Sequence, residues 1–289
     1  HPRVRRQRQM CIRDSRYTQD RWKVPHSESD NWKFERIYRI NFFLSEALPK
    51  FGEDMSGSQN TISGSVATIK HYIGEMYFLR AYEYFKKLQL FGDFPIINQP
   101  LADEMEALRE ASKRFPRNEV ARFILEDLDK AISYLASRGK FNGQRVNREA
   151  ALLFKSRVAL FEATFEKYHK GSGRVPGDNN WPGANMPYNS GKNFSIDSEV
   201  DFFLTEAMNA AKHVADNAQL TTNNHVIEPQ PGVITGWNNY FEMYSQPSLA
   251  NVPEVLLWKQ YSFSLSISHD AASVSYTHLR AHETLRHLV

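Results

Sequence analysis

Five aromatic residues of this chain stand in loops rich in asparagine, proline and glycine, where an exposed ring can bind a ligand. They are Trp22, Trp32, Trp181, Trp237 and Tyr240. A flat aromatic ring covers the apolar C–H face of a sugar, while nearby amide groups hydrogen-bond the hydroxyl groups around its rim. Each such ring contributes about 1–3 kcal/mol of apolar transfer, and millimolar affinity needs about 4 kcal/mol, so two or three rings on one surface suffice.

An asparagine directly precedes three of these rings and supplies the polar half of such a site. The candidate ligand-binding residues are therefore Trp22, Asn31, Trp32, Asn180, Trp181, Trp237, Asn239 and Tyr240. Their contexts differ. Among these rings, Trp181 has the sequence context that most favours exposure, although a proline-flanked tryptophan can also hold its own loop in place. Trp32 begins an amphipathic helix, which favours burial in the core.

Catalytic and metal chemistry find little support in the residue pattern. The chain has no nucleophile-elbow, phosphate-loop or dinucleotide-binding motif. Asp127 and Asp129 stand two apart on a predicted helix and so point in different directions, which favours one solvated carboxylate and one helix–helix contact over an acid–base pair. His278 and His282 have i, i+4 spacing but lack the acidic partner of a zinc-protease motif. We therefore expect no enzyme activity, no cofactor and no metal site.

The two ends of the chain differ in character from the rest. Residues 1–15 hold five arginines and the single cysteine, Cys11, and residues 274–289 follow an abrupt change of composition. Both resemble translated sequencing-adapter read-through, so we expect artefactual tails around one domain, residues 16–273. The tails contribute +5 to the net charge of +3, which leaves −2 for the domain. The apparent basicity therefore gives no reason to expect a nucleic-acid partner.

Apolar residues at helical spacing predict the elements that position these loops. The expected helices lie at about 32–50, 65–91, 118–139, from 148 onwards, and 198–217. Asn118 and Asn147 are suitable N-caps, and Gly92 followed by Pro95 ends the second helix. Residues 254–265 combine β-branched and aromatic residues, which favours a strand.

Two polar residues stand on the apolar faces of these helices and need buried partners. Asn41 interrupts the stripe of the first helix, and we expect its amide to link that helix to a neighbouring backbone. Arg80 lies mid-helix among aromatic residues, where an unpaired charge is costly. The connections at 169–197 and 221–236 are long and rich in glycine, proline and asparagine, a pattern typical of functional or disordered loops.

Four blocks of the sequence resemble the SusD/RagB family of nutrient-binding outer-membrane lipoproteins. The longest is Gly74–Pro95, GEMYFLRAYEYFKKLQLFGDFP, which is similar to the family's GEA-x-FLRA-x-x-YF…FGD-x-P segment. The others are FILEDLDKAISYL at 123–135, REAALLFKSRVALFEA at 148–163, and Pro253–Val255, which matches two of three positions of the family's NEV. The resemblance extends over about residues 32–265 and marks the chain as an internal fragment of such a protein.

This resemblance implies a fold, a function and a partner. The fold is mostly α-helical, a tetratricopeptide-like helical repeat scaffold with long loops and a little β-structure near the C-terminus. The function is non-catalytic capture of oligosaccharide or polysaccharide by a surface-exposed lipoprotein of the outer membrane, with delivery to a SusC-like TonB-dependent transporter. Membrane association would come only through a lipid anchor absent from this chain, since its longest apolar runs fall short of a bilayer span.

Two alternatives remain open. A tetratricopeptide-type adaptor would bind peptides or protein partners in its concave groove, and it predicts basic or asparagine-rich positions on the groove helices. A SusD-like protein that takes up peptides or another nutrient would carry the same aromatic loops as a glycan binder. Tryptophans in loops favour glycan capture over the adaptor.

Overall fold

The computed structural model describes residues 31–52, 54–228, 230–233, 236–262, 264, 266 and 267. The chain divides into two compact units, and Phe34–Lys259 is the unit that holds all the helices described below. Trp22 and both of the expected artefactual tails lie outside the described residues, so the domain boundaries at 16 and 273 stay a prediction.

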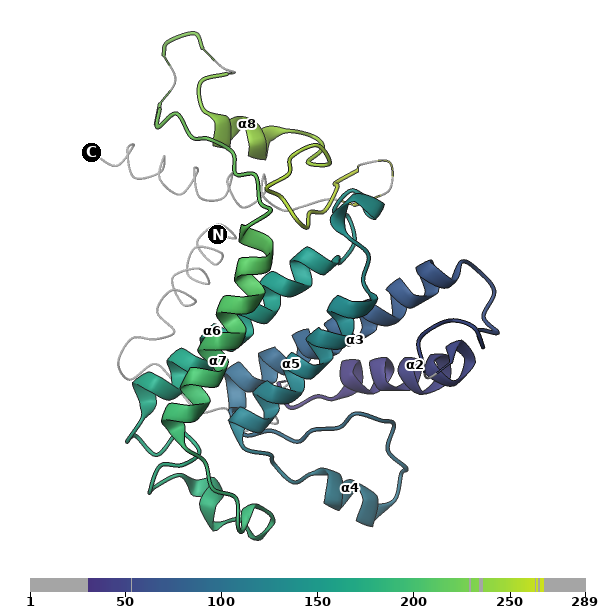
Figure 1. Cartoon of the computed structure of the whole chain (residues 1–289), viewed down its shortest axis with the longest axis vertical. Coiled ribbons are helices and arrows are strands. Elements are labelled where there is room, and N and C mark those ends of the chain that lie inside the picture. The colour runs from purple at the N-terminus through teal and green to yellow at the C-terminus, as the bar shows by residue number, and fades with distance from the viewer. Residues whose placement is uncertain are drawn as a thin grey trace, which may run out of the picture. The chain divides into compact units, whose positions relative to one another are not determined.

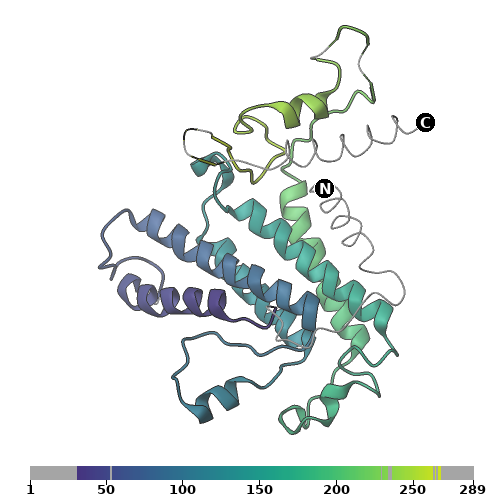
Figure 2. The same cartoon turned by 180° about the vertical axis from the view of Figure 1, so that it is seen from behind.

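Five long α-helices form the scaffold of this unit (Figure 1). They are α2 (Glu35–Phe51), α3 (Val66–Phe91), α5 (Arg117–Tyr134), α6 (Arg148–His169) and α7 (Ile196–Ala215). Each packs mainly against the next long helix along the chain, as both views show (Figures 1 and 2). Such nearest-neighbour packing is typical of helical repeats and confirms the mostly α-helical prediction. Of the helices described, none is both long and apolar enough to cross a membrane.

Shorter elements lie in the connections between these helices. They are α4 (Met105–Ala111), α8 (Asn239–Ser245) and the 3₁₀ turns η1 (Arg138–Phe141), η2 (Pro182–Asn185) and η3 (Pro187–Asn189). The main core lies between the long helices and is formed by apolar residues from all five, with Ile37, Tyr84, Ile124, Val158 and Phe203 nearly or fully buried. A Cβ at Gly74 of α3 would lie 3.0 Å from that of Tyr134, so α3 and α5 approach closely there.

Asn41, Arg80 and Asp127 form a buried polar network between α2, α3 and α5. Arg80 Nε and Nη2 donate to the two Asp127 carboxylate oxygens, each at 2.7 Å. Arg80 Nη1 donates to Asn41 Oδ1 at 2.9 Å, and Asn41 Nδ2 donates to the Ile97 carbonyl at 2.8 Å. Both predicted partnerships are thereby confirmed. The Asp129 side chain is 58% exposed, so the two aspartates point apart as expected.

Helix α5 begins two residues earlier than an N-cap at Asn118 would place it. Its first residue is Arg117 and Pro116 occupies the N-cap position, whereas Asn118 was the expected cap. The Arg117 backbone N–H is instead satisfied by the Asp93 carboxylate at 2.9 Å. A side chain from the preceding connection therefore does the capping, and Asn118 lies buried in the first turn.

The predicted strand at 254–265 does not form. The described residues contain two isolated β-bridges, one of them between Ser262 and Ile267, and no strand. Trp258 lies half-buried against the turn at 142–143, where its backbone N–H donates to the carbonyl of residue 143 at 2.9 Å and its indole N–H to that of residue 142 at 2.7 Å. Because no neighbouring strand offers a ladder of partners, these β-branched and aromatic residues pack as a loop.

Two side chains attach this last segment to the helices. The Arg138 guanidinium of η1 donates to four backbone carbonyls within 249–255, at 2.7–3.0 Å. Asn147 Nδ2 donates to the Leu256 carbonyl at 2.8 Å, while its Oδ1 accepts the Ala150 N–H and caps α6 as predicted. The segment is therefore fixed by polar contacts rather than by a sheet.

Candidate ligand-binding cavities

Two surface cavities of the compact unit contain residues that the sequence singled out. The first has a volume of about 430 Å³ and lies between the end of α3, the start of α5 and the 173–189 connection; Trp181 lines it. The second has a volume of about 370 Å³, lies beside α8, and is lined in part by Trp237. We name them the arginine cavity and the amide cavity after the polar residues that line them.

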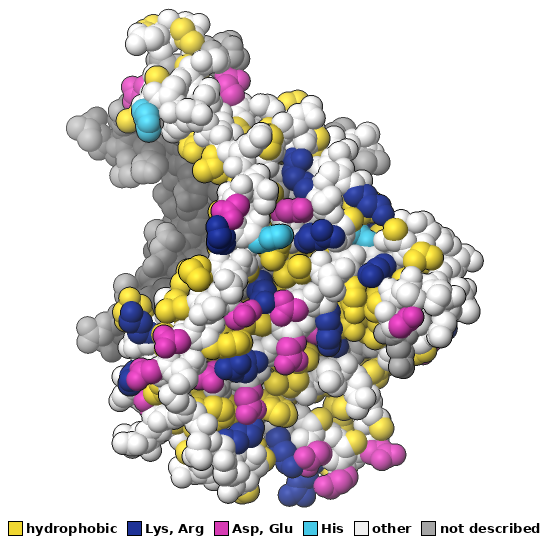
Figure 3. Space-filling view, viewed as in Figure 1, with side chains coloured by type: hydrophobic (Ala, Val, Ile, Leu, Met, Phe, Trp, Pro, Cys, Tyr) yellow, Lys and Arg dark blue, Asp and Glu magenta, His cyan; other side chains and the backbone are white. Residues whose placement is uncertain are grey.

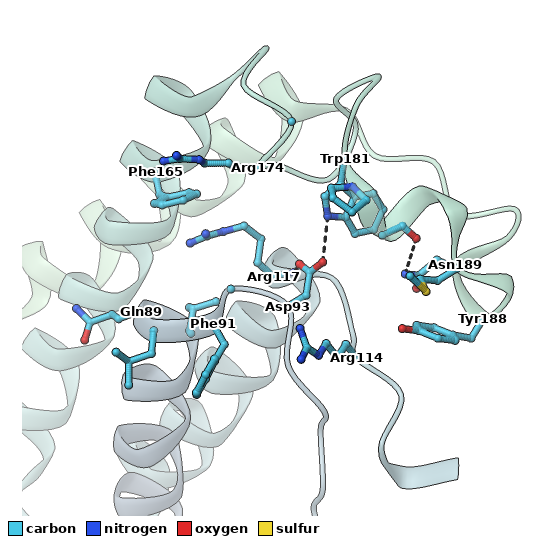
Figure 4. A pocket seen from close by; sticks show the side chains of 17 residues that line it. Gln89, Phe91, Asp93, Arg114, Arg117, Phe165, Arg174, Trp181, Tyr188 and Asn189 are labelled. Carbon is cyan, nitrogen blue, oxygen red and sulfur yellow. Dashed lines mark hydrogen bonds between the residues drawn. The ribbon is translucent and has the colours of Figure 1, made fainter. Parts of the chain in front are cut away.

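Asp93 connects three segments around the arginine cavity (Figure 4). One of its carboxylate oxygens accepts the Arg117 backbone N–H at 2.9 Å, and the other accepts the Trp181 indole N–H at 3.0 Å. Helix α3 ends at Phe91, two residues before Asp93, because Gly92 adopts a φ of +69° and donates its N–H to the Leu88 carbonyl. Burial raises the pKa of the Asp93 carboxyl, although both hydrogen bonds favour its ionised form.

Trp181 is buried, so the prediction that it is an exposed ring is wrong. Its exposed fraction is 5%. The ring lies so close to Gly183 that a Cβ there would come within 2.1 Å of it, and it meets the Phe194 ring edge to face at 6.0 Å. The indole N–H donates to Asp93, so the ring is buried without leaving its polar group unpaired. Trp181 therefore pins its loop, while its neighbour Asn180 stays exposed.

A buried ion pair and a protonated acid lie next to Arg117, which lines the arginine cavity. Arg117 donates from Nε and Nη2 to the two Glu162 oxygens, each at 2.7 Å, and its guanidinium carbon lies 3.3 Å from the Phe165 ring centroid. Glu166 is fully buried one turn further along α6, and burial together with the Glu162 charge raises its pKa to about 9. At neutral pH these groups therefore add no net charge.

The rim of the arginine cavity carries residues that the sequence reasoning missed. They are the exposed Arg114 and Arg174 and the half-buried Tyr188. In the view of Figure 4, Arg174 projects above Phe165, whereas Arg114 and Tyr188 lie below Asp93. Arg114 comes from the connection before α5, and Arg174 and Tyr188 come from the connection between α6 and α7, so no local spacing in the sequence could have united them.

The amide cavity has an aromatic wall made by Trp237 and Phe241. Their ring centroids lie 5.0 Å apart with an interplanar angle of 35°. Asn238 fixes this wall, because its Oδ1 accepts the backbone N–H groups of Tyr240 and Phe241 and so caps α8. Its Nδ2 donates to the Val226 carbonyl at 2.5 Å. The tryptophan is half-buried and lines the cavity.

The remaining candidates among the described residues line neither cavity, and Trp22 lies outside the described residues. Asn239 is exposed and donates its Nδ2 to the Thr222 carbonyl at 2.5 Å, and Tyr240 is 39% exposed. Asn31 and Trp32 are also exposed, and the 38% exposure of Trp32 contradicts its predicted burial because α2 begins only at Glu35. Of the eight candidates, the structure places Trp181 in one cavity and Trp237 in the other.

The two cavities differ in charge. No Lys or Arg occurs between residues 213 and 258, and Asn223, His225 and Asn238 supply the polar lining of the amide cavity. Figure 3 shows few charged side chains around α8, whereas Lys, Arg, Asp and Glu are interspersed over the helices below. Among the described residues, no group of three or more His, Cys, Asp or Glu residues could hold a metal ion.

Successive long helices that pack on one another, with cavities between their connections, define a helical-repeat scaffold. Residues 12–160 match the model of a SusD-like family described as starch-binding and associating with the outer membrane. Because this match covers more than half of the chain, the chain belongs to this SusD-like family. No match is found among curated proteins.

Similar solved structures are SusD-like proteins. Two are from Bacteroides fragilis NCTC 9343, with 20% and 16% identity, TM-scores of 0.39, and coverage of 64% and 65% of this chain. A laminarin-binding SusD-like protein has 20% identity and a TM-score of 0.37 over 52% of the chain. The alignments cover 26%, 30% and 31% of those three proteins, so the chain spans about a quarter to a third of their length.

Proposed function

We propose that this chain is part of an outer-membrane protein that captures oligosaccharide or polysaccharide at the cell surface without catalysis. The observation that carries this proposal is the family match over residues 12–160, since the family is described as starch-binding and outer-membrane-associated. Delivery of the glycan to a SusC-like TonB-dependent transporter, and anchoring as a surface lipoprotein, belong to the same proposal.

The amide cavity is the sugar subsite of this proposal. Its volume of about 370 Å³ falls within the range of about 300–1,000 Å³ that small-molecule sites occupy. Trp237 and Phe241 offer apolar ring surface, and Asn223, His225 and Asn238 offer hydrogen-bonding groups at its edge. An apolar wall with neutral donors and acceptors suits the C–H face and hydroxyl rim of an uncharged sugar.

Affinity electrophoresis of the full chain in gels containing starch, laminarin or xylan tests this assignment. We expect at least one polysaccharide to retard the protein, and Trp237→Ala to weaken retention about tenfold because a ring contributes about 1–3 kcal/mol. Tyr240→Ala is the matched control: Tyr240 is an exposed aromatic three residues away that lines neither cavity, and Asn238 bonds only its backbone.

Two results would contradict the proposal. The first is normal migration of the folded chain, checked by circular dichroism, in every polysaccharide gel. The second is equal loss of retention in Trp237→Ala and Tyr240→Ala, which would remove the amide cavity as the subsite. Release of reducing ends from any of these polysaccharides would contradict the non-catalytic part.

A further inference from the structure

The segment that forms the amide cavity is acidic. Residues 213–258 contain no Lys or Arg and four carboxylates, which belong to Asp216, Glu228, Glu242 and Glu254. In Figure 3 the charged side chains over α8 and the loop before it are accordingly acidic. Which of these charges act on the cavity depends on how many of them a nearby cation cancels.

Two of the four carboxylates are offset by basic side chains. Asp216 forms an ion pair with Lys212 at 2.7 Å. Glu254 lies within the backbone stretch 252–255, and the carbonyls at both ends of that stretch accept hydrogen bonds from the Arg138 guanidinium. A positive charge therefore lies close to each of these two acids, and they add little net charge to the cavity.

The other two carboxylates keep their charges next to residues that line the cavity. Neither Glu228 nor Glu242 forms an ion pair with any residue that the structure describes. Glu242 Oε1 accepts the Gly236 N–H at 2.7 Å, which holds this carboxylate one residue away from Trp237. Glu228 is exposed and directly follows Ile227, which also lines the cavity. The amide cavity therefore lies in a negative field.

The aromatic wall of the amide cavity also attracts positive charge, because the protein leaves it uncovered. On α3 the protein covers partly exposed rings with its own cations. Lys86 Nζ lies 4.1 Å from the ring centroid of Tyr82, and the Arg145 guanidinium carbon lies 4.7 Å from that of Tyr72. Among the described residues, no Lys or Arg lies over Trp237. The electron-rich face of an indole ring attracts an ammonium group.

We propose that the amide cavity binds saccharides that carry a positively charged amino group, which Trp237, Glu228 and Glu242 attract. This inference rests on the proposed function, because it names the class of sugar that the same subsite takes. An amino sugar keeps the apolar C–H face and the hydroxyl rim that the cavity suits, and its ammonium group adds attraction to the ring and to the carboxylates. A sugar that carries a carboxylate or sulfate is repelled by the same two glutamates.

Calorimetric titration of the full chain with a glucosamine oligosaccharide in two forms tests this inference. One form is N-acetylated and uncharged. The other is N-trimethylated, which gives a group of similar bulk whose positive charge does not depend on pH. We expect the cationic form to bind at least about tenfold more tightly, with an advantage that shrinks as salt is raised. A trimethylated lysine peptide is the third probe, since a peptide can present the same cation.

Variants then test the two carboxylates. Glu228→Gln and Glu242→Gln are each expected to lower the ratio of the two affinities, cationic over acetylated, by about threefold. Glu242→Gln keeps a side-chain oxygen that can accept the Gly236 N–H, so it removes the charge without removing the contact. Glu106→Gln is the matched control, because Glu106 is exposed on α4, which supplies no residue to this cavity.

The outcomes separate this inference from the proposed function. Equal affinities for the two forms of the sugar overturn it, as do equal effects of Glu228→Gln, Glu242→Gln and Glu106→Gln, while retention in neutral polysaccharide gels still supports glycan capture. Tighter binding of the lysine peptide than of the cationic sugar assigns the cavity to peptides and also overturns the inference. Failure of both sugar forms to bind overturns it as well, and the polysaccharide gels then decide separately whether glycan capture stands.

Discussion

The arginine cavity and the amide cavity are both built from connections rich in glycine, proline and asparagine, yet they use tryptophan in opposite ways. In the arginine cavity, Asp93 accepts the Trp181 indole N–H and the ring packs against Gly183, so the aromatic surface is buried within the protein. In the amide cavity, Trp237 keeps part of its ring surface towards the cavity, and its backbone carbonyl accepts a hydrogen bond from Asn224 Nδ2 at 2.7 Å. The local composition of a loop therefore does not decide whether a tryptophan is a ligand platform. What decides it is whether a buried acceptor lies within hydrogen-bonding distance of the indole N–H.

The largest effect that separates the two cavities is expected from the buried ion pair of Arg117, which lines the arginine cavity. Arg117→Met leaves Glu162 buried without its partner, which costs about 3–5 kcal/mol of unfolding free energy. Urea denaturation followed by circular dichroism measures this cost. Arg39→Met, which breaks an exposed pair on α2, should change stability by less than about 1 kcal/mol. Comparable losses in the two variants would contradict the buried pair described here.

An intermediate effect distinguishes the two tryptophans directly. Trp181→Phe removes the indole donor from Asp93 and should lower the unfolding free energy by about 1–3 kcal/mol. Trp237→Phe removes a donor that bonds nothing in the described residues and should cost less than about 0.5 kcal/mol. Neutral-glycan binding should show the reverse order: Trp237→Ala should weaken binding more than Trp181→Phe does. A larger stability loss in Trp237→Phe than in Trp181→Phe would break the comparison.

The last effect concerns pH and arises from Glu166, which is buried on α6 beside the Arg117–Glu162 pair. Glu166 has a pKa near 9 in the folded chain and an ordinary value of 4.5 otherwise, so unfolding between these pH values releases its proton. Stability contributed by this group therefore falls as pH rises from 5 to 8, by at most about 1.4 kcal/mol per pH unit. Glu166→Gln should flatten the slope, as urea midpoints at pH 5, 6.5 and 8 would record. An unchanged slope in the variant would mean that Glu166 is already ionised.

The sequence predicted the scaffold better than it predicted the cavities, for a physical reason. Helix α3 ends where Gly92 and Pro95 indicate, and Arg80 finds the anionic partner that its apolar surroundings require, because both signals act within one or two helices. The fate of Trp181 depends on Asp93, which stands 88 residues earlier, so no local pattern carries it. The same holds for Arg114 and Arg174, which line one cavity only after α3, α5 and α6 have packed.

The attachment of the last segment through Arg138 has a consequence for when its contacts can form during synthesis. Its four carbonyl acceptors lie 111–117 residues later in the sequence. At synthesis rates of about 5–20 residues per second, Arg138 leaves the ribosome roughly 5–25 s before they do. Helices α2 to α5 are made before that interval and α6 within it, and the residues around α8 are made near its end. A nascent chain arrested just after α7 would therefore already hold the residues of the arginine cavity and would still lack those of the amide cavity.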